Sequence, residues 1–267
     1  MKRKIEKKTP ISYYGGKQNM LKYILPTIPK HKIYVEPFFG GGAVFWAKPP
    51  IDVEIINDNN GLVVNFYEQL KTNFNQLKKA IDATPYSRDV YSKAMVVYKN
   101  AYLFSPVIKA WAFWVATIQG FSNKIGSWRS SQPRTKEAIL NFNKKILITN
   151  ELSKRLELVQ IENMDAIDLI KSKDSPTTFF YLDPPYVGAN QGHYGGYTQE
   201  HFVNLLDTLS KLKGKFILSS YPNEALKKYR KQNKWYVNDI NMPLSASNDK
   251  YRRKIECITW NYTIEHS

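Results

Sequence analysis

The stretch that decides the fold is Thr178-Phe179-Phe180-Tyr181-Leu182-Asp183-Pro184-Pro185-Tyr186. Its first five residues form a short apolar run, which is typical of a strand buried on both faces of a parallel sheet. The run stops at an acid and two prolines, which cannot continue a ladder of backbone hydrogen bonds. The stretch therefore predicts a buried strand that ends in a rigid turn.

This turn is rich in hydrogen-bond acceptors. Proline has no backbone N–H, so Pro184 and Pro185 contribute carbonyl groups that only accept, and Asp183 adds a carboxylate. Such acceptors suit an exocyclic amino group with its two N–H bonds, and Tyr186 offers a flat face to an unstacked base. The alternative is a rigid turn at a strand end that binds nothing.

Three similar apolar runs lie outward from this stretch, at Ile33–Glu36, Val53–Asn57 and Lys215–Ser220. Helical patterns follow these four runs, and this alternation predicts an open α/β sheet, mostly parallel, with right-handed crossovers. The expected helices cover residues 42–48, 62–81, 198–212 and 224–231. Two further strand-like runs, 235–240 and 254–262, are joined by a short polar link, which predicts an antiparallel pair at one side of the sheet.

Residues 82–152 interrupt this alternation. They predict helices over 86–100, 106–119 and 136–150 around a polar stretch, and we interpret them as an inserted helical subdomain. The remaining residues, 1–81 and 153–267, are expected to form the sheet-containing domain. The polar stretch carries basic and aromatic residues suited to phosphate contact and base stacking, and a solvated surface is the alternative: Lys124, Trp128, Arg129 and Arg134.

A glycine cluster occupies the turn after the first strand, within Tyr34-Val35-Glu36-Pro37-Phe38-Phe39-Gly40-Gly41-Gly42. Glycines there let the backbone approach a ligand at the carboxyl end of a strand, so a nucleotide cofactor is expected over this turn. The pattern is not GxGxxG, which argues against NAD or FAD. Asp58, just past the next strand, is placed to accept ribose hydroxyls, or alternatively to cap the following helix.

Composition indicates a folded protein that binds a polyanion. The 267 residues are 43% hydrophobic, and 39 Lys and Arg outnumber 23 Asp and Glu, which gives a formal net charge of +16. Nucleic acid is the leading partner for such a charge, and a solvated basic surface is the alternative. The single cysteine, Cys257, and four scattered histidines predict no disulfide framework and no metal site. The most apolar window, 101–118, is interrupted and short for a membrane span, so a buried helix and a cytoplasmic protein are expected.

Several motifs together resemble the Dam-like, α-group family of N(6)-adenine DNA methyltransferases. The resemblance covers nearly the whole chain and is weakest in 82–152. It rests on motifs in the family's order: residues 13–17 (YYGGK), 34–42 (YVEPFFGGG), Asp58, 183–186 (DPPY), 197–198 (YT), 216–220 (FILSS) and 255–262 (IECITWNY). The resemblance implies a Rossmann-like S-adenosylmethionine-dependent fold, with residues 82–152 as the target-recognition domain.

The resemblance also implies where the cofactor binds. The implied contacts are Tyr13, Lys17, Glu36, Pro37, Phe38, Phe39, Gly40, Asp58, Asp165 and Asp183. Asp165 matches an acid that lies near the cofactor adenine, although capping of the helix at 166 is equally consistent with the sequence. Two positions depart from the family pattern, since relatives often have Trp at Tyr13 and Ala at Gly41.

The expected activity is site-specific methylation of a flipped adenine in double-stranded DNA by a monomer or weak dimer, in a prokaryotic cell or from a phage. Asp183 and the Pro184 carbonyl are expected to orient the amino group, with Pro185 stiffening the turn. Tyr186 is expected to stack on the base and Tyr197 to close the pocket. Three alternatives stay open: a cytosine amino-methyltransferase, a protein-glutamine methyltransferase and a catalytically silent DNA-binding protein.

Overall fold

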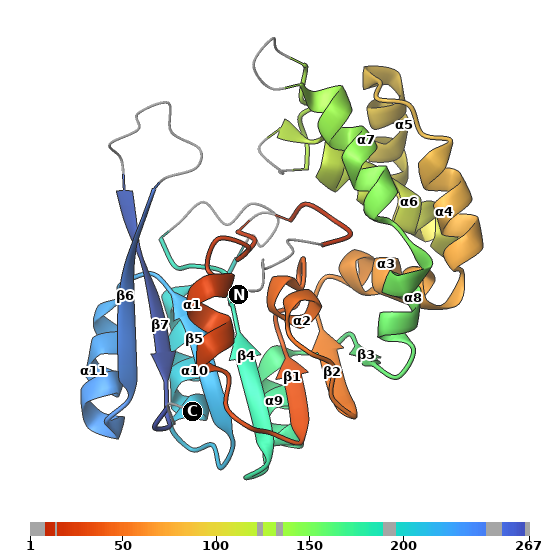
Figure 1. The fold of residues 1–267 in the computed structure, drawn as a ribbon. Helices are drawn as coiled ribbons and strands as arrows, with labels where there is room; N and C mark the ends of the chain where they lie inside the picture. Colours follow the sequence, from red (N-terminus) through yellow and green to blue (C-terminus); the bar gives the residue numbers. More distant parts are fainter. Residues whose placement is uncertain are drawn as a thin grey trace, which may run out of the picture.

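The computed structural model describes residues 9–13, 15–121, 125–131, 136–188, 196–243 and 253–264. Within these residues, seven strands form one sheet in the spatial order β3-β2-β1-β4-β5-β7-β6 (Figure 1). The strands in chain order are β1 (Ile33–Glu36), β2 (Val53–Asn57), β3 (Gln160–Glu162), β4 (Thr178–Leu182), β5 (Lys215–Ser220), β6 (Tyr236–Pro243) and β7 (Arg253–Trp260).

The sheet is mostly parallel, as predicted. Strands β1 to β5 pair in parallel, whereas β7 runs antiparallel to both β5 and β6. Four strands have the predicted bounds, and the C-terminal pair is antiparallel. The additional strand β3 was not predicted, because three residues with partly exposed side chains carry no apolar run. The predicted Rossmann-like fold class is therefore confirmed.

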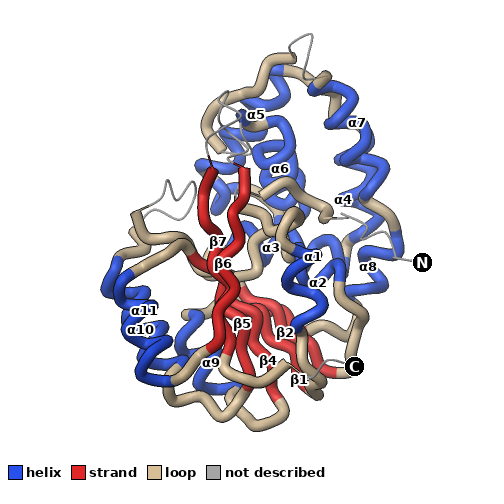
Figure 2. The backbone as a smooth tube through the Cα atoms, turned by 60° about the vertical axis from the view of Figure 1, so that its left-hand side comes forward, coloured by secondary structure: helices blue, strands red, loops and turns tan. Residues whose placement is uncertain are grey.

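Two layers of helices cover the sheet. One face packs against α9 (Ala166–Lys173), α10 (Gln199–Leu209) and α11 (Glu224–Asn233), and the other against α1 (Leu21–Ile24), α2 (Ala43–Ala47) and α3 (Gly61–Thr72) (Figure 2). Neighbouring strand residues serve opposite faces, because successive side chains of a strand alternate. Phe179 lies in the core between the sheet and α3, and Phe180 lies in the core on the opposite face, with α10.

The helix expected over residues 62–81 is two helices, and this prediction was wrong. Helix α3 ends at Thr72 and α4 (Phe74–Asp82) begins after Asn73, whose backbone (φ −126°, ψ 35°) is not helical. The Asn73 side chain donates to Gln69 Oε1 at 2.8 Å. Asparagine favours such local bonds over helix continuation, which explains a break that the apolar periodicity did not reveal.

The remaining helices gather beyond the carboxyl edge of the parallel strands (Figure 1). They are α5 (Arg88–Lys99), α6 (Pro106–Gln119), α7 (Glu137–Leu147) and α8 (Asn150–Leu156), with a short 3-10 turn at Ala101–Leu103. Another 3-10 turn, Leu25–Thr27, directly follows α1. Helix α6 has the predicted bounds, and the expected helix 136–150 ends at Leu147 before α8 starts. Buried side chains of α6 share one core with α3, and Trp114 Nε1 donates to the Pro10 carbonyl at 3.2 Å. This segment is thus anchored firmly on the sheet-containing part.

No helix among the described residues is long and apolar enough to cross a membrane. The apolar window 101–118 falls mainly in α6, whose residues from Ala112 to Gln119 are all buried. The expectation of a buried helix there is confirmed.

Candidate active site

The chemistry-bearing residues meet at the carboxyl edge of the parallel strands. In a parallel sheet these ends share one edge, and ligands bind there. Glu36 ends β1, Asp58 follows β2, and Asp183 follows β4. Residues from three distant parts of the sequence are therefore neighbours in the fold.

Lys17 connects the N-terminal segment to the turn after β4. Its Nζ lies 2.9 Å from Asp183 Oδ1, 2.8 Å from the Gly15 carbonyl oxygen and 4.6 Å from the centre of the Tyr186 ring. Only 6% of Lys17 is exposed. Little solvent screens the attraction between the two charges. These distances place Lys17, Asp183 and Tyr186, all predicted from the sequence, in one cluster.

The protonation of Asp183 reflects two opposing effects. Burial raises the pKa of its carboxyl group, and the ammonium of Lys17 opposes this through its charge and hydrogen bond. A buried carboxylate without a cation would favour the protonated form. Lys17 therefore favours the ionised form of Asp183, in which the carboxylate oxygens act only as acceptors.

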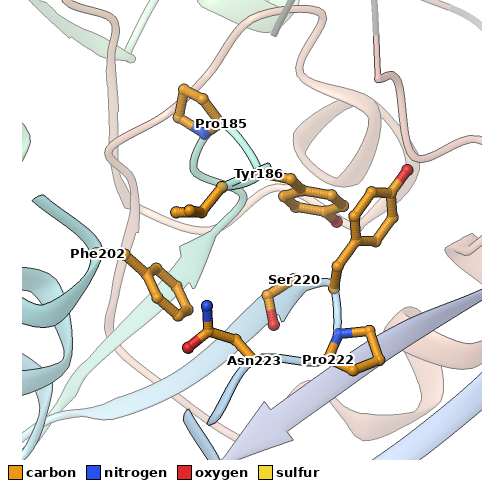
Figure 3. Close-up of a pocket in the computed structure, with 8 residues that line it drawn as sticks. Pro185, Tyr186, Phe202, Ser220, Pro222 and Asn223 are labelled. Carbon is orange, nitrogen blue, oxygen red and sulfur yellow. The ribbon is translucent and has the colours of Figure 1, made fainter. Parts of the chain in front are cut away.

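Tyr186 is fixed at its hydroxyl and along its ring. The hydroxyl donates to Glu256 Oε2 at 3.0 Å, and the ring makes an edge contact with Tyr221 at 4.3 Å between centroids. A hollow of about 10 Å³ lies between the loops after β4 and β5, and Pro185, Tyr186 and Ser220 are among its lining residues (Figure 3). This space has room for about one water molecule.

The glycine turn after β1 has a backbone that other residues do not adopt readily. Gly40 has φ +46° and Gly42 has φ +64°. A Cβ on Gly42 would lie 2.4 Å from the Phe39 ring, and a Cβ on Gly41 would lie 3.2 Å from the Cβ of Tyr13. Glycine at 41 thus lets the segment of Tyr13 cross closely over the turn, which accounts for the departure from Ala at this position.

Asp58 fastens this turn to the end of β2. Its Oδ2 accepts from the Gly40 amide at 2.8 Å, and its Oδ1 accepts from the Asn60 amide at 2.9 Å. Burial raises the pKa of its carboxyl group to about 6. The cap of α3 is Asn60, which accepts from the Leu62 amide. Each carboxylate oxygen of Asp58 retains acceptor capacity, which is what a ribose hydroxyl requires.

The residues before the glycines differ in burial: Glu36 and Phe39 are buried, and Phe38 is partly exposed. Glu36 accepts a hydrogen bond from Tyr34 at 2.6 Å, and burial raises its pKa to about 8. The Phe39 ring packs in the core against Phe45, whereas Phe38 is partly exposed. Glu36 and Phe39 therefore support the turn from beneath.

Asn57 was missed by the sequence analysis. Its Nδ2 donates to the carbonyls of Pro37 at 2.9 Å and Met164 at 3.1 Å, while its Oδ1 accepts from the Met164 amide at 2.9 Å. One buried amide thus joins the loops after β1, β2 and β3. A polar residue ending an apolar strand was the available signal.

A family model described as D12 class N6 adenine-specific DNA methyltransferase matches residues 13–255. The chain belongs to this family. The match covers the glycine turn, Lys17, Asp58 and the turn at Asp183. The predicted family, enzyme class and adenine specificity are confirmed, and membership implies the use of S-adenosylmethionine.

Three relatives of the methyltransferase carry related names. The type II methyltransferase M1.LlaDCHI of Lactococcus lactis subsp. cremoris is 25% identical over 261 residues, 84% of either protein. Modification methylase StsI of Streptococcus sanguinis is 25% identical over 289 aligned positions, and the alignment spans 96% of this chain and 43% of StsI. The DNA N-6-adenine-methyltransferase of Escherichia phage P1 is 40% identical over 57 residues, 21% of this chain and 7% of the phage protein.

Two further candidate residues of the methyltransferase lie near one another. Asp165 caps α9, since its Oδ1 accepts from the amides of Ile167 and Asp168. Burial, followed by the charge of Asp165, raises the pKa of Tyr197. The structure therefore shows the capping role of Asp165 and brings Tyr197 close to it.

The candidate DNA-contacting residues of the methyltransferase differ in their surroundings. Lys124 and Arg134 lie outside the described residues. The guanidinium of Arg129 is 2.8 Å from Glu137 and also donates to the Ile118 carbonyl. Trp128 stacks obliquely on Tyr86, and it carries the Arg88 guanidinium 4.5 Å from its ring centre.

A hollow of about 380 Å³ lies between α5 and the segment around Gly126 and Trp128, with Arg88 and Lys99 among its lining residues. Basic and aromatic groups are among the residues around it.

The part of the methyltransferase that the structure describes contains no cluster of three His, Cys, Asp or Glu side chains able to hold a metal ion.

Proposed function

We propose that the carboxyl edge of the sheet binds S-adenosylmethionine beside a flipped adenine, and that Asp183 orients the adenine amino group. The observation that carries this proposal is the cluster of Lys17, Asp183 and Tyr186 at the end of β4. It combines a carboxyl acceptor, whose ionised form Lys17 favours, and a flat aromatic ring at one turn. These are the two elements that recognition of an unstacked amino base requires.

The residues around the glycine turn fit the methyl donor. Gly40 to Gly42 leave backbone space that a Cβ would fill, and Asp58 retains acceptor capacity for ribose hydroxyls. Tyr13 and Lys17 border the same turn, and Asp165 is proposed to lie near the adenine of the cofactor. When bound, S-adenosylmethionine supplies an electrophilic methyl group on a positively charged sulfur.

Asp183 and the Pro184 carbonyl are proposed to accept the two N–H bonds of the adenine amino group. This turns the nitrogen lone pair away from the ring and toward the methyl group, so the new N–C bond forms as the methyl group leaves its donor. Tyr186 stacks on the base and Tyr197 closes the pocket. The amino proton becomes acidic only after transfer, so no strong base is needed beforehand.

DNA is proposed to bind across the basic helical segment, residues 82–152, which acts as the target-recognition domain beside a catalytic domain of residues 1–81 and 153–267. Trp128 and Arg88 offer an aromatic face and a charge. Lys124 and Arg134 are proposed phosphate contacts. The internal ion pair of Arg129 supports a structural role for this residue.

The proposed setting is a prokaryotic cell or phage infection, with a cytoplasmic monomer or weak dimer that needs no metal ion. The names of the relatives, a type II methyltransferase and a modification methylase, support a restriction–modification role.

The test is incubation of the purified protein with isotopically labelled S-adenosylmethionine and unmethylated genomic DNA, with EDTA present. The DNA is then digested, its nucleosides are identified by mass, and modified positions are sequenced. Labelled N6-methyladenine in a recurring short motif is expected, and Asp183→Ala should lack it. Label on cytosine would show that the accepted amino group is that of cytosine and would contradict the proposed adenine acceptor. Label absent from DNA despite measured cofactor binding would overturn it.

A further inference from the structure

Tyr186, in the turn proposed to hold the target base, is hydrogen-bonded to a strand far away in the sequence. Its hydroxyl donates to Glu256 Oε2 at 3.0 Å. Glu256 lies on β7, and only 4% of it is exposed. Because β7 runs antiparallel to β5, its early residues lie at the carboxyl edge of β5, where Cys257 is opposite Ser220. The direction of β7 therefore brings Glu256 to the site.

Glu256 is itself held by a cation. Its Oε1 lies 2.5 Å from Lys254 Nζ, which donates to the Tyr221 hydroxyl at 3.0 Å. Tyr221 in turn makes the edge contact with the Tyr186 ring at an interplanar angle of 64°. Lys254 and Glu256 are two residues apart on one strand, so their side chains lie on the same face. The four residues form a closed ring of contacts, which we name the Glu256 cluster.

A buried ion pair is poor evidence of stabilisation alone, because apolar residues of similar volume often serve as well. The Glu256 cluster has a more specific consequence, because Glu256 and Tyr221 both contact Tyr186 directly and Lys254 holds both of them. Lys17 lies toward the ring, Tyr221 contacts it obliquely, and Glu256 holds its hydroxyl. Together these contacts restrict both side-chain torsions of Tyr186, and so they define the plane that a base would meet.

We propose that Glu256, held by Lys254, is a positioning residue that fixes the ring plane of Tyr186 for stacking on the flipped adenine. This inference rests on the proposed function. It assigns a role to β7, a strand to which the proposed function gives no ligand contact. The strand orients the ring through the hydrogen bond between the Tyr186 hydroxyl and Glu256.

The test uses three variants of the full chain: Glu256→Gln, Tyr186→Phe and the double variant. Tyr186→Phe keeps the ring and removes only the hydroxyl. Tyr186→Phe is expected to slow single-turnover methylation about tenfold, the size expected for losing a hydrogen bond to a charged group. Glu256→Gln keeps a neutral amide acceptor and loses the charge, so it should slow methylation less. The double variant should be no slower than Tyr186→Phe alone, because Glu256 is proposed to act on the ring only through this hydroxyl. Glu224→Gln, in an exposed ion pair with Lys227, is the control and should match wild type.

Stacking has its own signal. DNA with 2-aminopurine at the target position fluoresces when the base leaves the helix and is quenched when it stacks on an aromatic ring. Glu256→Gln and Tyr186→Phe should bind this DNA with brighter fluorescence than wild type, and their affinity for S-adenosylmethionine should be unchanged. Lys254→Met should show the same brightening, which provides an answer if Glu256→Gln does not fold.

Rate losses that multiply in the double variant would overturn the inference. So would a Glu256→Gln protein with a lowered melting temperature but wild-type rate and fluorescence, since this is the pattern of a purely structural residue. Methylation of adenine by the wild-type protein is measured before any variant. Its failure would contradict the proposed function, whereas the variants test only the role of Glu256.

Discussion

The ammonium of Lys17 lies 2.9 Å from Oδ1 of Asp183, so the segment before β1 supplies the counter-charge for the turn after β4. The two residues are far apart in the sequence, and both are largely buried. Their pairing determines how readily Asp183 accepts hydrogen bonds, and it gives the first prediction.

Replacing Lys17 by Met should move the acidic limb of the pH–rate profile to higher pH. Lys17 opposes the burial that raises the pKa of Asp183, so its loss raises this pKa further, and the carboxyl then protonates at a higher pH. The profile is measured by single turnover at saturating S-adenosylmethionine. Exposed Lys22→Met is the control. A Lys17→Met limb at the wild-type pH contradicts the pairing.

Asp183→Ala should lower the methylation rate by roughly a thousandfold, the size seen when a group that orients reacting atoms is removed. DNA binding should persist, because phosphate contacts elsewhere dominate affinity. Single-turnover rates and gel-shift titration check the two expectations, with exposed Asp52→Ala as a control. Turnover of Asp183→Ala near the wild-type rate would exclude the assigned role.

Glu36 should make the free energy of unfolding depend on pH. Its pKa is raised from 4.5 to about 8 in the folded protein, so the folded state holds the proton more tightly. Its contribution to stability is fully present below pH 4.5 and is lost as pH rises through about 8. Glu36→Gln should remove a slope of about 1.4 kcal/mol per pH unit in this window. Urea titrations across the window test this, and parallel wild-type and variant curves would contradict it.

Asp58→Ala should weaken binding of S-adenosylmethionine more than tenfold and cost about 2 kcal/mol of stability, since two backbone amides lose their acceptor. Asn60→Ala separates the two effects, because Asn60 caps α3 and makes no proposed cofactor contact. This control should cost about 1 kcal/mol and leave cofactor affinity unchanged. Calorimetry and thermal unfolding measure both. Equal affinities for the two variants would remove Asp58 from the cofactor site.

Gly42→Ala should cost about 3 kcal/mol, because a positive φ and a clash with the Phe39 ring act together. Gly188→Ala is a matched control with φ +75° and open space around the new Cβ, and it should cost about 1 kcal/mol. Denaturant unfolding of both variants isolates the effect of the clash. Equal losses would show that Phe39 moves aside without cost.

The sequence pattern predicts β1, β2, β4 and β5 with their observed bounds, since buried parallel strands are short apolar runs ended by polar residues or turns. It does not predict β3, whose three residues become a strand only because β2 offers its backbone groups. The break at Asn73 was missed for a related reason, because helical periodicity continues on both sides of it.

The candidate site was predictable in part. Asp58 and Asp183 each follow a strand, so their shared edge follows from the parallel order of the sheet. Glu256 was not assigned a role, because its position depends on the register of an antiparallel strand against β5. The crossing of Tyr13 over Gly41 likewise depends on where the segment before the first strand lies.

Strand β7, the last strand in chain order, lies inside the sheet between β5 and β6. During synthesis on the ribosome, β5 therefore cannot pair with β7 until the other six strands of the sheet have emerged. A chain that stops before Arg253 leaves β5 without this neighbour and Tyr186 without Glu256. Premature termination within this region thus yields protein that has the glycine turn but an incomplete base site, so truncated products are expected not to modify DNA.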